Sequence, residues 1–403
     1  MVPDWRAALL AGAAALALSA CAAIPDLGSA PEPKPSSTYA VRQSFGAPAI
    51  EWPSDHWWTA YGDSQLDQLI EEALAGAPDL AKAQARVRRA EALAEMADST
   101  LGPHLDAVAS VAEAKQSYNN GIPSALVPHG WRDIGLVGAG LDWQIDFFGK
   151  NHALLAAATS DADAARAEEA EARLTLSTAV AAAYASFARL YADRDAAEEA
   201  LRVRADSEHL ISQRCGRGLE TQAALERAHA GRADAEAELA ATDEAIGLSR
   251  NGIAALLGQG PDRGLRITRP APGAIHAFGL PASLQADLVG RRPDVTAARL
   301  SAEAAASRIK VAKAEFYPNV NLTAFIGVQS LGLNVLTRAG SSMGSVGPAI
   351  TLPIFESGRL QGNYRGARAE YDEAVAGYDE TLTKALQDVA DSAVSARALN
   401  ARL

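Results

Sequence analysis

The chain has 403 residues, and its 37 Lys and Arg against 49 Asp and Glu give a formal net charge of -12. Because nucleic-acid affinity depends largely on Lys and Arg displacing counterions from phosphates, this balance argues against nucleic acid as a partner. Aromatic residues make up only 6% of the chain, which favours long Ala-rich helices packed side by side over compact aromatic cores. The two cysteines are Cys21 and Cys215. Since the first lies in a leader, a disulfide scaffold is excluded.

The first residues have the layout of a secretory signal. An early cation, an apolar run and then small residues follow one another in residues 1–20, which predicts a signal peptide and export from the cytoplasm. The segment ending at Cys21 resembles the bacterial lipobox, in which the cysteine is acylated, and Ala22 after it implies routing to the outer membrane. We therefore expect a covalent lipid on Cys21 and a Pro-rich, extended lipidated tether over residues 21–56. An ordinary cleaved signal with an incidental cysteine is the alternative.

The rest of the chain is predicted to be a tandem duplication. Pro78 and Pro103 recur as Pro293 and Pro318, each at an offset of 215 residues. Equal offsets preserve the spacing of 25 within each copy, which makes chance a poor explanation. The sequence then divides into two repeats, residues 57–262 and 263–403.

Each repeat is predicted to begin with an Ala-rich helix and to end in a long one. The Ala-rich runs are 80–100 and 295–316, each preceded by Pro-Asp, where Pro fits the first helical turn and Asp interacts favourably with the dipole. No proline interrupts residues 151–214, so a helix of roughly 64 residues, or about 95 Å, is expected. A return helix is expected over about 220–257. The chain ends at a point equivalent to mid-helix, so we expect the second long helix to be partial, with its tip and return helix missing.

Between these helices the pattern changes to an alternation of apolar and polar residues, which is typical of strands with two unlike faces. It predicts four strands near residues 105–111, 137–147, 319–328 and 346–354. Their length suits transmembrane strands. Since no stretch of 18 or more apolar residues occurs elsewhere, we expect any further membrane insertion to be by strands.

The alternation assigns side chains to two surfaces. The residues expected to line a water-filled lumen are Asp142, Gln144, Asp146, Asn319, Asn321, Thr323 and Thr351. The residues expected to face lipid are Leu141, Trp143, Ile145, Phe147, Leu322, Ile326, Ile350 and Leu352. Because open strand edges in lipid leave backbone groups unsatisfied, four strands must be closed by other chains. Two chains would give a barrel of eight strands, whose interior is filled by side chains, whereas three chains would give twelve strands and leave a lumen. If the barrel conducts solutes, we therefore expect a homotrimer. A soluble sandwich with one wet face is the alternative.

Several segments resemble the TolC-like outer-membrane efflux proteins, in particular the lipoprotein branch paired with resistance-nodulation-division pumps. The matching segments are Trp57–Asp63, Asp142–Lys150, Leu280-Pro281 with Arg291-Arg292-Pro293-Asp294, Ala314–Pro318 and Leu352–Arg359. The resemblance implies a mainly α fold with a membrane β-barrel portion. Each repeat would supply an equatorial helix, two barrel strands and long helices, so that a trimeric twelve-stranded barrel continues as a helical tunnel across the periplasm.

The resemblance also implies how such a chain works. It would be the outer-membrane channel of a tripartite efflux system, a passive exit duct for drugs or small solutes that an inner-membrane pump delivers. A periplasmic adaptor protein would bind at the helical tip, which the resemblance places at Gly218 and Leu219, followed by Glu220 and Thr221. An outer-membrane duct for protein secretion and a periplasmic coiled-coil structural lipoprotein are the alternatives.

No catalytic or metal site is predicted. Residues 340–344 match the G-x-S-x-G nucleophile elbow, but no histidine follows them, so the order Ser, acid, His cannot be completed and a flexible loop is favoured. A lipid-anchored hydrolase acting through Ser342 is the enzyme alternative. The histidines include no close pair at metal-ligand spacing, and Cys215 stands alone. We therefore expect neither an enzyme nor a cofactor other than the lipid on Cys21.

Overall fold

The Ala-rich runs form the expected helices. In this computed structural model, which describes residues 24–46, 50–119, 121–271, 281, 284 and 290–402, α3 and α8 both have 22 residues and begin at prolines 215 positions apart. The helices are α2 (Ser64–Gly76), α3 (Pro78–Ser99), α4 (Lys150–Gly216), α5 (Gln222–Leu256), α6 (Pro261–Gly264), α8 (Pro293–Ala314) and α9 (Arg359–Arg402). The predicted duplication and the predicted long helix are confirmed, α4 being about 100 Å long.

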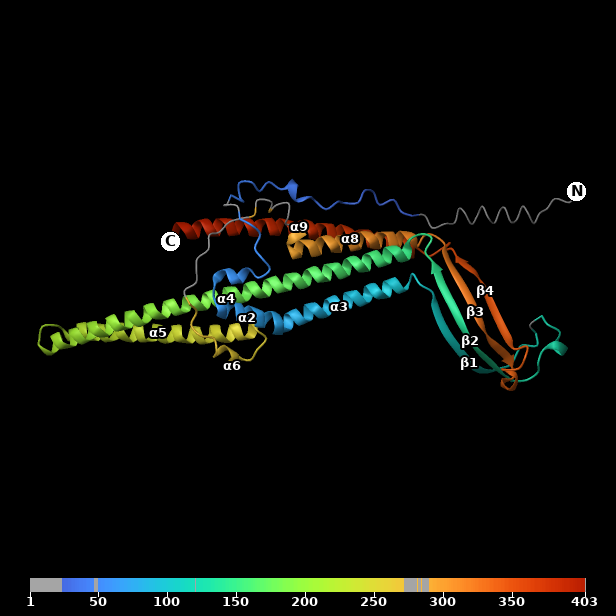
Figure 1. The fold of residues 1–403 in the computed structure, drawn as a ribbon, viewed down its shortest axis with the longest axis horizontal. Helices are drawn as coiled ribbons and strands as arrows, with labels where there is room; N and C mark the ends of the chain where they lie inside the picture. The colour runs from blue at the N-terminus through green and yellow to red at the C-terminus, as the bar shows by residue number, and fades with distance from the viewer. Residues whose placement is uncertain are drawn as a thin grey trace. The chain divides into compact units, whose positions relative to one another are not determined.

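Four strands form one antiparallel sheet in the order β1-β2-β3-β4 (Figure 1). Their bounds are β1 (His104–Ala114), β2 (Arg132–Ile145), β3 (Asn319–Leu331) and β4 (Ser342–Thr351). β1 and β3 again begin 215 residues apart, as the repeat requires. β1 and β4 are the two edges of the sheet, and almost every residue in them is exposed.

Three predicted face residues lie outside the strands, which is a correction to the sequence-based bounds. Asp146 and Phe147 follow the end of β2, and Leu352 follows the end of β4. The Asp146 carboxylate accepts a hydrogen bond from the backbone N–H of His152 at 2.9 Å, and its Oδ2 lies 2.6 Å from the His152 ring Nδ1. Burial alone would raise the pKa of Asp146, but these hydrogen bonds outweigh it and lower the pKa. The backbone here therefore turns to start α4 instead of continuing the strand.

The connection between the third and fourth strands is also shorter than the predicted strands, 319–328 and 346–354, implied. β3 extends to Leu331 and β4 begins at Ser342, so the second half of the 340–344 motif is strand and not loop. Ser342 pairs with Val328 across the sheet. Strand pairing gives the backbone N–H and C=O groups at these positions hydrogen-bond partners, which explains why the strands extend and the turn between them is short.

The described residues group into two units. The sheet unit comprises residues up to 34, 88–164 and 297–381, and the hairpin unit comprises the remainder. Each unit combines segments from both sequence repeats. None of the helices in the described part of the chain has a stretch long and apolar enough to cross a bilayer.

The core of the hairpin unit forms where α2 packs against α4 and α5. Leu69 and Ile70 of α2, Phe187 of α4 and Ile253 of α5 are all fully buried in one cluster. A polar contact closes one side of this cluster, because Tyr184 donates a hydrogen bond to Asp63 Oδ2 at 2.7 Å. Burial and the neighbouring carboxylate raise the pKa of the Tyr184 hydroxyl, so it stays protonated as the donor.

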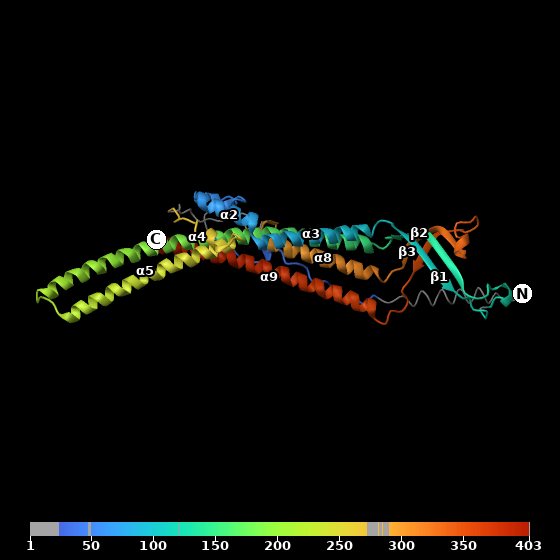
Figure 2. The ribbon, with the colours of Figure 1, turned by 90° about the horizontal axis from the view of Figure 1, so that it is seen from below.

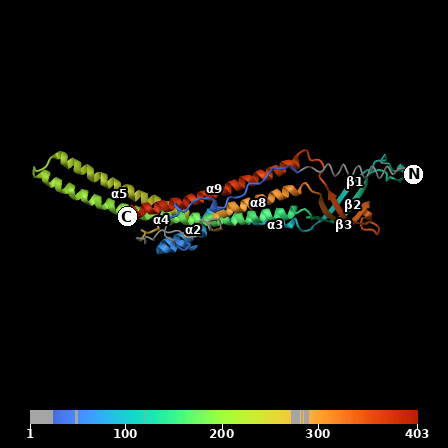
Figure 3. The same ribbon diagram turned by 90° about the horizontal axis from the view of Figure 1, so that it is seen from above.

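Beyond this core, α4 and α5 continue side by side to their connecting turn (Figures 2 and 3). No residue between 198 and 241 is buried. Ion pairs link the two helices, Arg194 with Asp243 at 2.7 Å and Glu208 with Arg232 at 3.4 Å. Exposed ion pairs contribute little stability, and most helical stability comes from tertiary packing. This half of the hairpin therefore has little buried core within the described chain.

The N-terminal segment, for which the sequence predicted an extended tether, contacts α9 through side chains of that helix. In the sheet unit, Arg368 donates hydrogen bonds to the carbonyl oxygens of Gly28 and Ser29 at 3.3 and 2.5 Å. Lys34 forms an ion pair with Asp379 at 3.3 Å. The segment is extended because it is Pro-rich, and its carbonyl groups are satisfied by side chains of α9.

We predict that Gly258→Ala destabilises the hairpin unit more than Gly218→Ala. Both glycines have left-handed φ angles, +69° and +73°, so either substitution costs about 1 kcal/mol of backbone strain. A Cβ at Gly258 would also lie 2.7 Å from the Gly76 carbonyl oxygen and 2.8 Å from Pro78 Cδ, whereas nothing lies within 4 Å at Gly218. We expect overpacking to add about 1–3 kcal/mol. Guanidinium unfolding followed by circular dichroism measures the difference, and equal losses would contradict the close approach.

Candidate conduit wall and tip

The strand register places the predicted polar residues on one face of the sheet. Directly opposite residues in an antiparallel pair share a face. The pairs on this face are Asp142 with Thr323, Gln144 with Asn321, and Asn319 with Thr351. Asn321 Nδ2 donates across the strands to Asp142 Oδ2 at 3.4 Å. The predicted polar residues that lie in strands thus form one continuous surface over β2, β3 and β4.

The opposite face is apolar and open. It carries Leu105 with Leu141, Trp143 with Leu322, Ala139 with Ile326, and Val320 with Ile350. The strands hold ten exposed large apolar side chains, of which seven are on this face: Leu105, Val111, Val137, Trp143, Ile326, Val346 and Ile350. Val346 is 77% exposed and Ile326 73%. An apolar surface of this extent indicates contact with lipid or with another protein surface.

An aromatic side chain, Phe325, also lies on the polar face, and no role was predicted for it. The ring of Phe325 covers Gly138 and Gly327, which are paired directly across β2 and β3. A Cβ on Gly138 would lie 2.4 Å from Phe325 Cζ, and one on Gly327 would lie 3.0 Å from Phe325 Cε1. The two glycines leave room for the ring to lie close to the backbone. The contact could have been predicted from the pairing of two glycines across the strands. That pairing is known only once the strand register is known.

The connections from sheet to long helix are built alike in both repeats. Gly149 and Gly358 have φ of +72° and +87°, the left-handed conformation in which glycine has no Cβ penalty. The next residues, Lys150 and Arg359, begin α4 and α9. Both cations approach the Glu315 carboxylate, at 4.0 and 3.7 Å. One carboxylate at the end of α8 therefore links the starts of both long helices.

The turn between α4 and α5 contains the predicted tip residues. Gly218 is left-handed, the Leu219 N–H donates to the Arg214 carbonyl at 2.8 Å, and the Gly218 N–H donates to the Cys215 carbonyl at 2.9 Å. This is the hydrogen-bond pattern of a Schellman C-cap. Thr221 then caps α5 by accepting a hydrogen bond from the backbone N–H three residues later.

The tip also presents an apolar side chain to solvent. Leu219 is 66% exposed, and the Glu220 carboxylate lies 3.9 Å from the Arg214 guanidinium. α5 begins at Gln222, so Glu220 and Thr221 belong to the turn and the cap. All four tip residues therefore lie together at the end of the hairpin.

The sequence also bears on metal binding and on lipidation. Among the described residues, no group of three or more His, Cys, Asp and Glu is arranged to hold a metal ion. Cys21, its signal segment and Leu280 lie outside the described residues. The chemistry of the described site is thus that of surfaces: one polar and one apolar sheet face, and an exposed tip.

Comparison with known proteins gives the context for these surfaces. A family model described as outer membrane efflux protein matches residues 69–259 and 284–403. The fusaric acid resistance protein FusA of Burkholderia cepacia is 36% identical over 326 residues, which are 79% of this chain and 60% of FusA. The multidrug resistance outer membrane protein MdtP of Escherichia coli K12 is 30% identical over 358 residues, which are 87% of this chain and 73% of MdtP.

A solved structure shares the fold. The outer membrane protein VceC of Vibrio cholerae superposes with a TM-score of 0.82 and 44% identity, covering 87% of this chain and 83% of VceC. The predicted fold class, long helices with a small antiparallel sheet, is confirmed by this likeness. The family matched is one of membrane efflux proteins and not of enzymes, in agreement with the expectation that the chain is not an enzyme. The chain spans about 60% of the length of FusA.

Proposed function

The chain belongs to the outer membrane efflux protein family, and we propose that it is the outer-membrane channel of a tripartite efflux system. In this proposal it is a passive exit duct for drugs or other small solutes. An inner-membrane pump supplies the energy, and a periplasmic adaptor protein joins the pump to the duct. The names of FusA and MdtP, which refer to fusaric acid resistance and multidrug resistance, support a small-molecule cargo.

The observation that carries the proposal is a one-sided sheet with two free edges. The apolar face of β1–β4 is exposed, and β1 and β4 each have one side without a strand partner in this sheet. In lipid, such edges must be closed by hydrogen bonds to other chains. Three copies supply twelve strands, enough for a barrel that leaves a lumen. The lumen is then lined by the polar face with Asp142, Gln144 and Asn321, and the face with Trp143 and Leu322 meets lipid.

The hairpin supports the same homotrimer. Since no residue in 198–241 is buried, α4 and α5 need neighbouring helices in order to be stable. Three copies around one axis supply such neighbours and enclose a helical continuation of the lumen. The assembly extends into the periplasm in this proposal.

We predict that a water-soluble, negatively charged thiol reagent blocks a channel carrying Asp142→Cys but not one carrying Trp143→Cys. The two residues are adjacent on β2 and lie on opposite faces of the sheet, so one thiol is in the lumen and the other in lipid. Both variants are made with Cys215→Ser, which removes the free thiol of the described chain. Single-channel conductance in planar bilayers measures the block, which should come in up to three steps, one per subunit.

The controls for this measurement concern assembly. The complex should show the mass of three chains and a gel mobility that changes on heating. A purified product that is monomeric and never inserts into vesicles contradicts the proposed function. A block at Trp143→Cys in place of Asp142→Cys would reverse the assignment of the faces.

We also propose that a lipid on Cys21 anchors the chain in the outer membrane. Arg368, which holds the Gly28 carbonyl, lies nine residues after the start of α9, a rise of about 14 Å. Gly28 lies seven positions after Cys21, and an extended chain of seven residue steps spans up to about 24 Å. An acylated Cys21 can therefore reach the level at which the strands meet the helices.

For the anchor, we predict that palmitate labels the wild-type chain in growing cells and does not label Cys21→Ser. Cys215→Ser is the matched control, because it removes the other cysteine of the sequence, and it should keep the full label. The reason is that only Cys21 follows a lipobox-like segment. Label retained in Cys21→Ser would show that residue not to be the acylation site.

For the adaptor, we predict that Leu219→Ala weakens docking about tenfold, as expected for an exposed apolar side chain central to an interface. Leu248→Ala is the control, since Leu248 is 62% exposed against 66% for Leu219 and lies on α5 away from the turn. The measurement is drug susceptibility of a strain in which this chain is the sole exit duct, with cross-linking to the adaptor. Equal resistance in both variants, with normal assembly, would exclude the tip as the docking site.

A further inference from the structure

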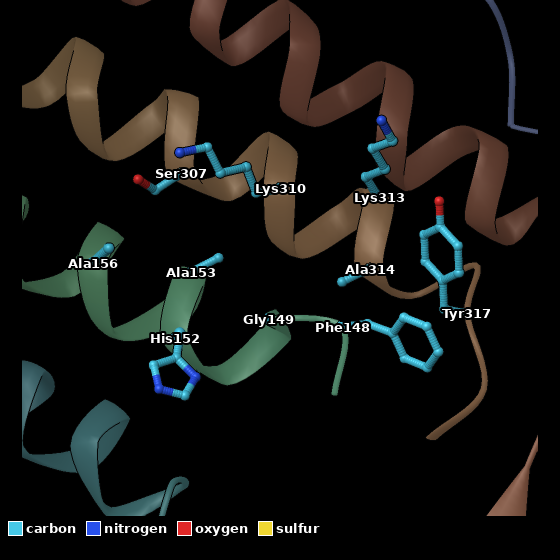
Figure 4. Close-up of a pocket in the computed structure, with 10 residues that line it drawn as sticks. All are labelled: Phe148, Gly149, His152, Ala153, Ala156, Ser307, Lys310, Lys313, Ala314 and Tyr317. Atoms are coloured by element: carbon cyan, nitrogen blue, oxygen red, sulfur yellow. The ribbon is translucent and has the colours of Figure 1, made fainter. Parts of the chain in front are cut away.

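A cavity of about 660 Å³ lies in the sheet unit between the first turns of α4 and the last turns of α8 (Figure 4). Phe148 and Tyr317 form one end of it, with ring centroids 4.9 Å apart and an interplanar angle of 13°. His152 contributes from α4, and Lys310 and Lys313 contribute from α8. The cavity therefore has an aromatic end and is lined by two lysines, whose ammonium groups point in different directions in Figure 4.

The two lysines carry uncompensated charge. In the part of the chain that the structure describes, neither Lys310 nor Lys313 has an acidic partner within ion-pair distance. The neighbouring cations are all paired: Lys150 with Glu315 at 4.0 Å, His152 with Asp146 at 2.6 Å, and Arg308 with Asp161. An anion entering the cavity would meet two positive charges that no acidic side chain neutralises.

The sequence repeat provides an internal comparison. α3 and α8 have the same length and the same register at an offset of 215 residues. At the positions equivalent to Lys310 and Lys313, α3 carries Glu95 and Asp98. The repeated helix thus forms equally well with acids at these two positions. The lysines are therefore not required for helix formation, and the positive charge that they bring is specific to this cavity.

The cavity lies beside the apolar face of the sheet. His152 lines it and also lines a second cavity, whose wall includes Trp143 and Phe147. Phe147 is 67% exposed, and Phe355, in the other strand–helix connection, is 85% exposed. Exposed aromatic side chains at the end of a membrane-facing surface are typical of the membrane–water interface. The lysines thus follow directly after an interfacial aromatic zone, on its helical side.

We propose that this cavity binds the phosphate headgroup of an anionic phospholipid in the periplasmic leaflet of the outer membrane. Lys310 and Lys313 would bind the headgroup phosphate, and its acyl chains would lie along the Trp143 and Phe147 side of the sheet. Cations within a Debye length of an anionic lipid surface attract it, and those next to a membrane-facing aromatic zone are placed to do so. The inference rests on the proposed function for the membrane position but not on conduction.

The test measures binding of fluorescent phosphatidylglycerol to the purified full-length chain in a neutral detergent. The variant Lys310→Glu with Lys313→Asp transfers the residue types of the first repeat, and Lys310→Ala with Lys313→Ala removes the charges alone. The control, Lys82→Ala with Lys384→Ala, removes two exposed lysines of the hairpin unit. We expect both cavity variants to bind about ten- to thirtyfold more weakly, and the control to bind as the wild type does.

The outcomes separate the sources of the phosphate. Displacement of the lipid by millimolar inorganic phosphate identifies a site for phosphate as such, whereas displacement only by anionic lipid identifies a lipid site. Phosphatidylcholine, which has the phosphate but no net charge, should bind weakly. Undiminished binding by correctly folded cavity variants, or an equal loss in the control, overturns the proposal. Because lipid binding in detergent requires no conductance, a failure here is distinct from a failure of the channel.

Discussion

The structure depends on one constraint, that the backbone hydrogen bonds of a sheet edge cannot end in hydrocarbon. The four strands alternate so regularly that one face is apolar and exposed, yet β1 and β4 each leave one side without a strand partner among the described residues. In hydrocarbon, a single copy of this sheet would leave the backbone hydrogen-bonding groups at its two edges without partners. In the trimer that we propose, closing the sheet with copies of itself would turn the apolar face outward and the polar face inward, so that the same step would satisfy the backbone and create a lumen.

The helices show the same incompleteness on a larger scale. α4 and α5 bury a core against α2, but from residue 198 to 241 their residues are at most partly buried. Most helical stability comes from tertiary packing, and in the homotrimer that we propose, neighbouring copies would supply that packing around the axis that closes the sheet. In that proposed trimer, the Gly218 turn would be the end of a helical wall, with Leu219 exposed. In the function that we propose, such an assembly would move solutes without making or breaking bonds, so its chemistry would reside in its surfaces.

Several charged and aromatic residues of the sheet unit lie at or near the connections between strands and helices. Glu315 approaches the first cation of both long helices, and the N-terminal segment is held along α9 by Arg368. Beside them, Lys310 and Lys313 are cations without an acidic partner in the described structure. A lipid on Cys21 and lipid headgroups in the cavity would both act at this level, and together with the exposed aromatic residues they would set the depth of the protein in the membrane.

Local features were predictable because they depend on residues close in the chain. The period of two assigned Asp142 and Trp143 to opposite faces, the repeated prolines marked the starts of α3 and α8, and a glycine marked the tip. Tertiary structure decided the rest. β2 ends at Ile145 because Asp146 accepts a hydrogen bond from His152. Phe325 covers Gly138 because the strand register places Gly138 directly opposite Gly327. The cavity of Lys310 was not foreseeable, because packing alone brings α8 beside the distant start of α4.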